Sequence, residues 1–130
     1  MSKKLPTFTA IDLPYLQLLN QMEAQPREVK IYVTHEDECP FEVWFASLRD
    51  RNAKARIRSR LDRIEMGNLG DFKAVGDGVL ELRIDYGPGY RMYFAQTGET
   101  IVLLLCGGDK SSQPRDILIA KQYLDDFQQR

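Results

Sequence analysis

The chain has 130 residues, a hydrophobic content of 43% and a formal net charge of −1. These values fit one compact domain with a buried core and exclude global disorder. No apolar run is long enough for a transmembrane helix, and no apolar segment follows the N-terminal lysines as in a secretory signal. We therefore expect a cytoplasmic protein that does not enter a membrane.

The first part of the chain is expected to be an extension followed by a strand. Residues 1–27 form the extension, in which Thr9 or Asp12 could cap a short helix that runs to about Gln25. Apolar residues then alternate with polar ones over residues 28–34, which predicts a strand. We expect a single folded domain over residues 28–130.

Two helices are expected next. Pro40 begins the first, which runs to about residue 48, and apolar residues at helical spacing predict a second over residues 53–66. Gly67 follows the second helix as a stop signal. Because the connection between the two helices is short, we expect them to form a helical hairpin.

The second half of the chain changes to a period of two. Strands are expected over residues 79–85, 90–96 and 100–106, joined by turns as an antiparallel meander. A last helix is expected over residues 114–128. The order β-α-α-β-β-β-α predicts an α+β fold, in which the helical hairpin and the C-terminal helix pack on an antiparallel sheet.

The second helix carries a basic stripe. Residues 51–63 hold six basic side chains against one acidic side chain, Asp62. Such a stripe is the local feature that a polyanion would sense. A solvated helix face rich in arginine explains it equally well.

The residues offer no familiar catalytic set. The cysteines, Cys39 and Cys106, match no zinc, redox or disulfide spacing, and we find no catalytic triad, metal-ligand spacing or phosphate-cradling loop. The single histidine, His35, is expected at a loop or strand end. We therefore expect no metal and no cofactor.

The informative feature is a group of cations. Arg83 and Arg91 lie on the polar faces of neighbouring predicted strands, Lys110 lies in the loop after the third strand, and Lys73 lies in the loop before the first. Tyr93 shares the face of Arg91. We expect these five side chains to converge on one surface of the sheet.

Fixed cations around a phosphodiester could orient it and stabilise the charge of a pentacovalent transition state. Arginine suits this task because its planar guanidinium binds two phosphate oxygens at once. A neighbouring aromatic ring could stack on an unpaired base. The alternative is that both arginines form ordinary surface ion pairs with Glu81, Asp85 or Glu99.

From about residue 28 to its end, the chain resembles the RelE/ParE superfamily of toxins, and most closely its HigB-like branch of addiction-module killer proteins. The resemblance is carried mainly by GDGVLELRI at 76–84, YGPGYRMYF at 86–94 and LLCGGDKSS at 104–112. Weaker matches lie at 47–50, 55–63 and 67–71. Residues 1–27 have no counterpart in that pattern.

This resemblance implies the toxin of a type II toxin–antitoxin system, whose partner is a helix-turn-helix antitoxin. It also implies metal-free cleavage of mRNA, usually on the ribosome, with the ribose 2′-hydroxyl as nucleophile. By analogy Arg91 binds the scissile phosphate and stabilises the transition state, Arg83 supports it, and Lys110 stabilises the leaving oxygen. Lys73 would hold backbone phosphate, and Tyr93 would stack on or position a base.

One departure from the superfamily leaves the general base open. RelE-type enzymes place a tyrosine early in the last helix, and the aligned place here falls near Asp116. Tyr123 lies further along the helix. Two other functions therefore remain: a ParE-like inhibitor that binds gyrase, and a non-toxic remnant that only binds an antitoxin.

Overall fold

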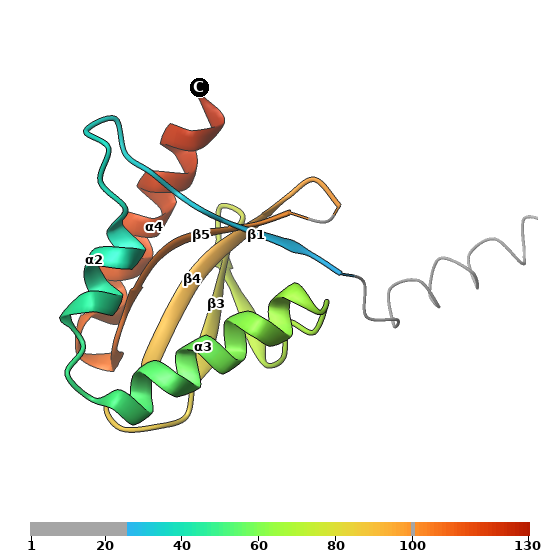
Figure 1. Cartoon of the computed structure of the whole chain (residues 1–130). Helices are drawn as coiled ribbons and strands as arrows, with labels where there is room; N and C mark the ends of the chain where they lie inside the picture. The colour runs from blue at the N-terminus through green and yellow to red at the C-terminus, as the bar shows by residue number, and fades with distance from the viewer. Residues whose placement is uncertain (1–25, 100) are drawn as a thin grey trace, which may run out of the picture.

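The structure, a computed structural model, describes residues 26–99 and 101–130, and the helix expected to end near Gln25 lies outside them (Figure 1). The described chain is an α+β fold, as expected. Its elements in order are β1 (Glu28–Ile31), α2 (Pro40–Ser47), α3 (Arg51–Glu65), β2 (Phe72–Gly76), β3 (Val79–Ile84), β4 (Tyr90–Thr97), β5 (Ile101–Gly108), the 3-10 turn η1 (Lys110–Ser112) and α4 (Gln113–Gln128).

The five strands form one sheet in the order β1-β5-β4-β3-β2. Strands β2 to β5 are an antiparallel meander, but β1 pairs parallel with β5. The sheet is therefore mixed and not purely antiparallel as expected. The reason lies in the connection: after α2 and α3 the chain enters the sheet at the opposite edge as β2, and the last strand of the meander, β5, then runs beside β1 in the same direction.

Strand β2 was expected to be a loop. Its residues are almost all exposed because it is the edge strand, so the sequence shows no apolar alternation there. It pairs with β3 through Phe72↔Leu82 and Lys73↔Glu81. The turn between them is Asp77-Gly78, with φ of 55° and 86°, a conformation typical of a tight hairpin turn.

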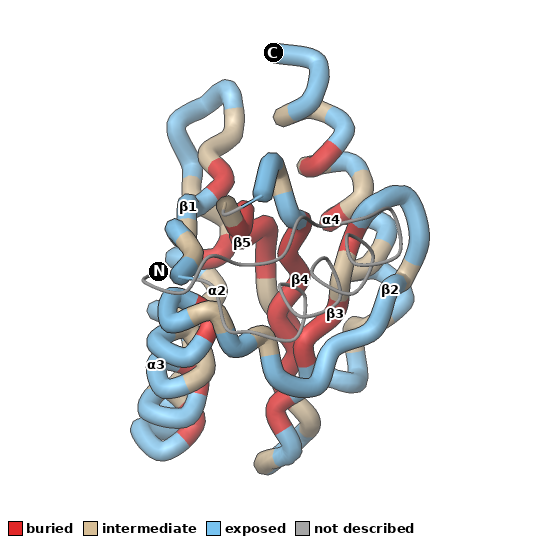
Figure 2. Tube along the Cα trace, turned by 90° about the vertical axis from the view of Figure 1, so that its right-hand side faces the viewer, coloured by how far each residue is buried: buried red, intermediate tan, exposed pale blue. Residues whose placement is uncertain are grey.

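Helices α2 and α3 cover one face of the sheet, and α4 covers the other (Figure 1). Strands β3, β4 and β5 supply the core between these layers, and they are the most buried part of the chain (Figure 2). Helices α2 and α3 both contribute side chains to one core against the sheet (Figure 1). The two helices lie at an angle to each other (Figure 1).

Helix α3 begins where the sequence provides a cap. The Asp50 carboxylate accepts hydrogen bonds from the backbone N–H groups of Asn52 and Ala53, at 2.9 and 3.2 Å. Ala53 and Ile57 then lie on the buried side of the helix, and the basic residues lie on the outer side. Within the described residues, no helix has the length and apolar character needed to cross a membrane.

Candidate functional site

Two rows of polar side chains cross the sheet on the face that α4 covers. One row aligns Lys73 of β2, Glu81 of β3 and Tyr93 of β4, and the next aligns Arg83 of β3 with Arg91 of β4. Residues that are aligned across strands, or two apart along a strand, share a face of the sheet. The structure thus places these five residues on one face of the sheet, and four of them are the sheet residues that the sequence predicted for the site.

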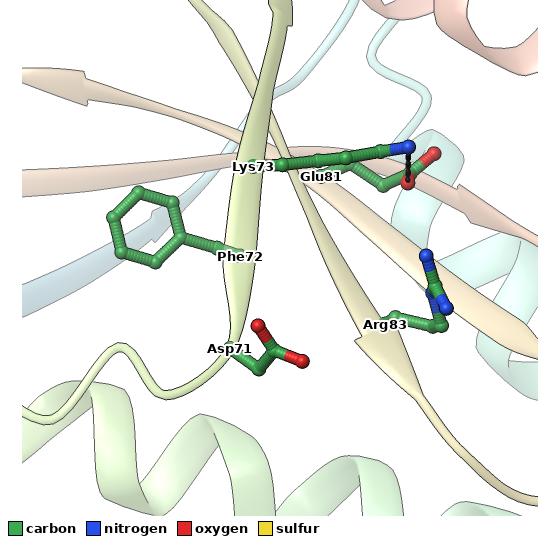
Figure 3. A pocket seen from close by; sticks show the side chains of 5 residues that line it. All are labelled: Asp71, Phe72, Lys73, Glu81 and Arg83. Carbon is green, nitrogen blue, oxygen red and sulfur yellow. Dashed lines mark ion pairs between the residues drawn. The ribbon is translucent and has the colours of Figure 1, made fainter.

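Lys73, Glu81 and Arg83 point to the same side of the sheet, whereas Phe72 points to the other (Figure 3). Together with Asp71 they line a shallow pocket. Lys73 and Arg83 are both exposed here. Lys73 lies in a strand rather than in the loop that the sequence suggested, so its position relative to Glu81 is fixed by the register of the sheet.

Glu81 lies at the centre of the site and is 1% exposed. Its Oε2 accepts hydrogen bonds from the Tyr93 hydroxyl at 3.0 Å and from Nε2 of Gln113 at 2.9 Å. Two cations flank the carboxylate: Lys73 Nζ is 3.7 Å from Oε1, and Arg91 Nε is 3.7 Å from Oε2. The buried carboxylate is thus bound by two neutral donors and lies within ion-pair distance of two cations.

Tyr93 is completely buried. Burial and the hydrogen bond to Glu81 raise the pKa of its phenol, so the hydroxyl keeps its proton and donates it to the carboxylate. Its ring offers no free surface on which a base could stack. In this structure Tyr93 lies in the core and orients the Glu81 carboxylate through its hydroxyl.

Arg91 is 5% exposed, although the sequence placed it on a polar strand face. Its Nη1 donates a hydrogen bond to the Gly89 carbonyl at 2.7 Å, whereas its buried Nε has no hydrogen-bond partner within residues 26–99 and 101–130. The Gly-Pro-Gly turn just before β4 thus fixes the guanidinium. Gly89 has φ of 79°, and a side chain there would press on Nη1 of Arg91, 3.2 Å from the new Cβ.

Lys110 is exposed and lies beside the same turn. Its backbone N–H donates to the Pro88 carbonyl at 3.4 Å, and its Cβ lies 3.6 Å from where a Gly89 side chain would begin. Asp109 caps the turn η1 by accepting a hydrogen bond from the Ser111 N–H at 2.8 Å. The structure therefore brings Lys110 next to Arg91, around Gly89.

The two glycines that end β5 have different neighbours. A side chain at Gly107 would overlap the ring of Trp44 in α2, and one at Gly108 would overlap the carboxylate of Asp116 in α4. Gly108 is also the cross-strand partner of Arg91. The carboxylate of Asp116 therefore lies over the strand next to Arg91.

The last helix provides no tyrosine to this site. Asp116 stands in its first turn and accepts a hydrogen bond from the Ser112 hydroxyl at 2.5 Å. Tyr123 stacks on Tyr32, with ring centroids 4.9 Å apart, and belongs to the core beneath α4. Tyr123 therefore lies outside the candidate site.

The basic side chains of α3 lie on the opposite side of the sheet from α4 and meet the site at one strand. Arg60 donates a hydrogen bond from Nη1 to the backbone carbonyl of Arg83 at 3.1 Å. Arg56 stacks over the Tyr86 ring, 4.5 Å from its centroid. With Arg63 they line a second shallow pocket. Among the described residues no carboxylate forms a salt bridge with any of these three arginines.

Across residues 26–99 and 101–130, no three potential metal ligands lie close enough together to hold an ion. The two residues that the sequence did not single out are Glu81 and Gln113. The sequence placed Glu81 only as a possible surface partner of an arginine. Its position two residues from buried Val79 and opposite Tyr93 was the available signal.

Residues 44–125 match the family described as phage-derived protein Gp49-like (DUF891), which is more than half of the chain. The chain is also similar to an uncharacterized protein of Haemophilus influenzae, strain Rd, at 51% identity over 81 residues. That match spans 62% of this chain and 82% of the relative.

Proposed function

Because the chain belongs to the phage-derived Gp49-like family, which is related to addiction-module toxins of the RelE and HigB type, we propose that it is the toxin of a toxin–antitoxin pair and cleaves mRNA. The observation that carries this proposal is the immobilised Arg91. It lies beside the exposed cations Arg83 and Lys110, at the open end of the sheet.

A fixed guanidinium suits phosphate chemistry. A donor that is already in place when negative charge develops stabilises the transition state without a cost for reorganisation. Arg91 is held by the Gly89 carbonyl and by the charge of Glu81, so it has little freedom left to lose. Arg83 and Lys73 are exposed on the same face and would bind neighbouring backbone phosphates.

The proposed reaction is a transesterification within the RNA. The ribose 2′-oxygen forms a bond to the adjacent phosphorus while the bond from phosphorus to the 5′-oxygen breaks. The products are a 2′,3′-cyclic phosphate and a 5′-hydroxyl. One proton leaves the 2′-hydroxyl, and one proton reaches the 5′-oxygen, for which the Lys110 ammonium is the nearby donor.

The acceptor of the 2′-proton in this proposal is Asp116. Its carboxylate lies over Gly108, which is aligned with Arg91, and the resemblance puts the tyrosine of RelE-type enzymes near this position. Glu81 is unsuited to this task because its Oε2 already accepts two hydrogen bonds and the side chain is buried. Asp109 accepts two hydrogen bonds from Ser111, whereas Asp116 accepts one from the Ser112 hydroxyl.

The partner in this proposal is a helix-turn-helix antitoxin that covers a basic surface of the toxin. The outer side of α3 offers such a surface, with Arg56, Arg60 and Arg63 around one pocket. An acidic antitoxin segment bound there would lose affinity as salt increases, because salt screens exposed charges.

Brief induced expression without the antitoxin tests the function. We expect growth arrest with shortened mRNA half-lives and new RNA ends inside coding regions. If transcripts stay intact while broken DNA accumulates on gyrase, the chain is a gyrase inhibitor. If growth continues and the protein is folded, the chain is a non-toxic antitoxin-binding domain.

A further inference from the structure

We propose that Glu81 is a positioning residue that holds the Arg91 guanidinium in place for the scissile phosphate. This inference rests on the proposed function, since it assigns a role within the same site. Glu81 acts through Arg91 and does not itself touch RNA, because only 1% of it is exposed.

The contacts of Glu81 divide into two kinds. Neutral donors, Tyr93 and Gln113, bind Oε2 at hydrogen-bond distance and fix the orientation of the carboxylate. The cations Lys73 and Arg91 stand further away, each at 3.7 Å, where they interact by charge and not by a hydrogen bond. The neutral donors thus fix the carboxylate by hydrogen bonds, and the carboxylate attracts the two cations by its charge.

This arrangement leaves one buried donor of Arg91 without a partner among the described residues. Its Nε finds no acceptor there, and both hydrogen bonds to Glu81 Oε2 come from other residues. A buried donor without a partner is rare in folded proteins and needs an explanation. The carboxylate oxygen beside this nitrogen is Glu81 Oε2, 3.7 Å away, so the guanidinium is held there by charge and not by a hydrogen bond.

Glu81 also offsets a repulsion that the site would otherwise contain. Arg83 and Arg91 are aligned on neighbouring strands, and like charges directly opposite one another destabilise a sheet. Lys73 is aligned with Glu81 on the other side. Without the carboxylate, Lys73, Arg83 and Arg91 would repel one another on one face of the sheet. Arg91, the buried cation, would then lower its electrostatic energy by moving toward solvent.

The test compares Glu81→Gln and Glu81→Asp in the full chain, with Glu65→Gln in α3 as an exposed control. The glutamine keeps the size and the ability to accept hydrogen bonds but removes the charge. On mRNA-programmed ribosomes, we expect Glu81→Gln to lower the rate constant at saturation at least tenfold and Glu81→Asp to recover part of it. Affinity for a fully 2′-O-methylated RNA oligonucleotide, which cannot be cleaved, should stay equal or rise, because a negative charge is lost.

A purely structural role gives a different result. It predicts that the rate, the RNA affinity and the melting temperature fall together in Glu81→Gln. It also predicts additive losses in the pair Glu81→Gln and Arg91→Lys, whereas a residue acting through Arg91 adds little once that guanidinium is gone. Either of these structural results would overturn the inference.

A second measurement does not depend on cleavage. The Nε–H resonance of Arg91, assigned by its loss in Arg91→Lys, can be followed by ¹⁵N NMR. We expect it to shift and to exchange faster with water in Glu81→Gln than in Glu65→Gln. If the wild-type chain cleaves no RNA but this resonance moves, the proposed function fails and the positioning stands. An unchanged resonance would overturn the positioning.

Discussion

Nε of Arg91 lies 3.7 Å from Oε2 of Glu81, and both side chains are at least nine-tenths buried where the sheet meets the start of α4. The ion pair joins two positions that lie ten residues apart in the sequence, on the neighbouring strands β3 and β4. It makes the arginine part of the interior of the protein while leaving it beside the exposed cations Arg83 and Lys110.

Substitution of Arg91 should remove activity. We expect Arg91→Ala to lower the cleavage rate by about a hundred- to a thousand-fold, as for loss of a preorganised donor. It also leaves Glu81 with Lys73 as its only cation, so the free energy of unfolding should fall by about 3 kcal/mol. Growth arrest, cleavage rate and thermal melting measure both effects.

Arg91→Lys separates the two effects. It keeps the positive charge near Glu81, so it should melt near the wild-type temperature, but an ammonium cannot bind two phosphate oxygens in one plane and activity should recover only in part. Arg49→Ala, an exposed arginine between α2 and α3, is the control and should remain toxic. A folded Arg91→Lys with full activity would contradict the assignment of a planar, two-oxygen contact.

The two glycines at the end of β5 should have separable roles. Gly107→Ala forces a methyl group against the Trp44 ring, so we expect a loss of about 1–3 kcal/mol in the free energy of unfolding, as in other overpacked cores. Gly108→Ala displaces the Asp116 carboxylate, a side chain that can move, so the cleavage rate should fall more than the stability does. Denaturant titration and cleavage assays of both variants check this, and equal stability losses would contradict it.

The cap of α3 should make stability depend on pH. The hydrogen bond from the Tyr86 hydroxyl, followed by the backbone N–H of Ala53, holds the pKa of Asp50 below its usual value. A carboxyl whose pKa is lowered on folding stabilises the protein above its unfolded pKa, and that contribution is lost as the pH falls through the folded pKa. Asp50→Asn keeps a capping oxygen without the charge.

We therefore expect wild-type protein to melt at a higher temperature than Asp50→Asn near neutral pH, and the two curves to converge in acid. Thermal melts across the acidic range measure the difference, with the exposed helical residue Asp62 changed to Asn as the control. A constant difference between wild type and Asp50→Asn at every pH would show that the charge contributes nothing.

The two thiols should react at different rates. Burial raises the pKa of Cys106 to about 12, so at pH 8 this thiol is protonated and shielded. Cys39 is half-buried, before α2, and should react first with a thiol reagent. Reagent titration of the native and the unfolded protein, with Cys39→Ser as the control, should show Cys106 reacting only on unfolding. Rapid native labelling of Cys106 would contradict its place beneath α4.

Much of the fold follows from the sequence, because its strands and helices have clear periods. Strands β3 to β5 alternate or run apolar, and the Gly-Pro-Gly turn marks the start of β4. Strand β2 escapes this reasoning because an exposed edge strand needs no apolar face. The parallel pairing of β1 escapes it because the partner, β5, is separated from it by most of the domain.

The sheet face that the candidate residues share was predictable from the sequence, but its burial was not. Alternation correctly groups Arg91 with Tyr93 on one face, but it does not say how far α4 extends along that face. In the structure α4 begins over the row of Glu81 and Tyr93, and Gln113 donates a hydrogen bond to Glu81. The same polar strand face is therefore buried at Tyr93 and exposed at Arg83. Which polar residues are buried is thus decided by tertiary packing.

The central claim is that this chain cleaves RNA with its own side chains around Arg91, and the chemistry of the cut ends tests it most directly. Purified full-length protein is added to mRNA-programmed ribosomes. The reaction contains a chelator for any divalent ions that the protein carries, and enough magnesium that the ribosomes keep theirs. We predict fragments that end in a 2′,3′-cyclic phosphate and begin with a 5′-hydroxyl, no cut where the scissile nucleotide is 2′-deoxy, and almost no product with Arg91→Ala. Uncut mRNA with folded wild-type protein, or equal cleavage by Arg91→Ala, would contradict the claim.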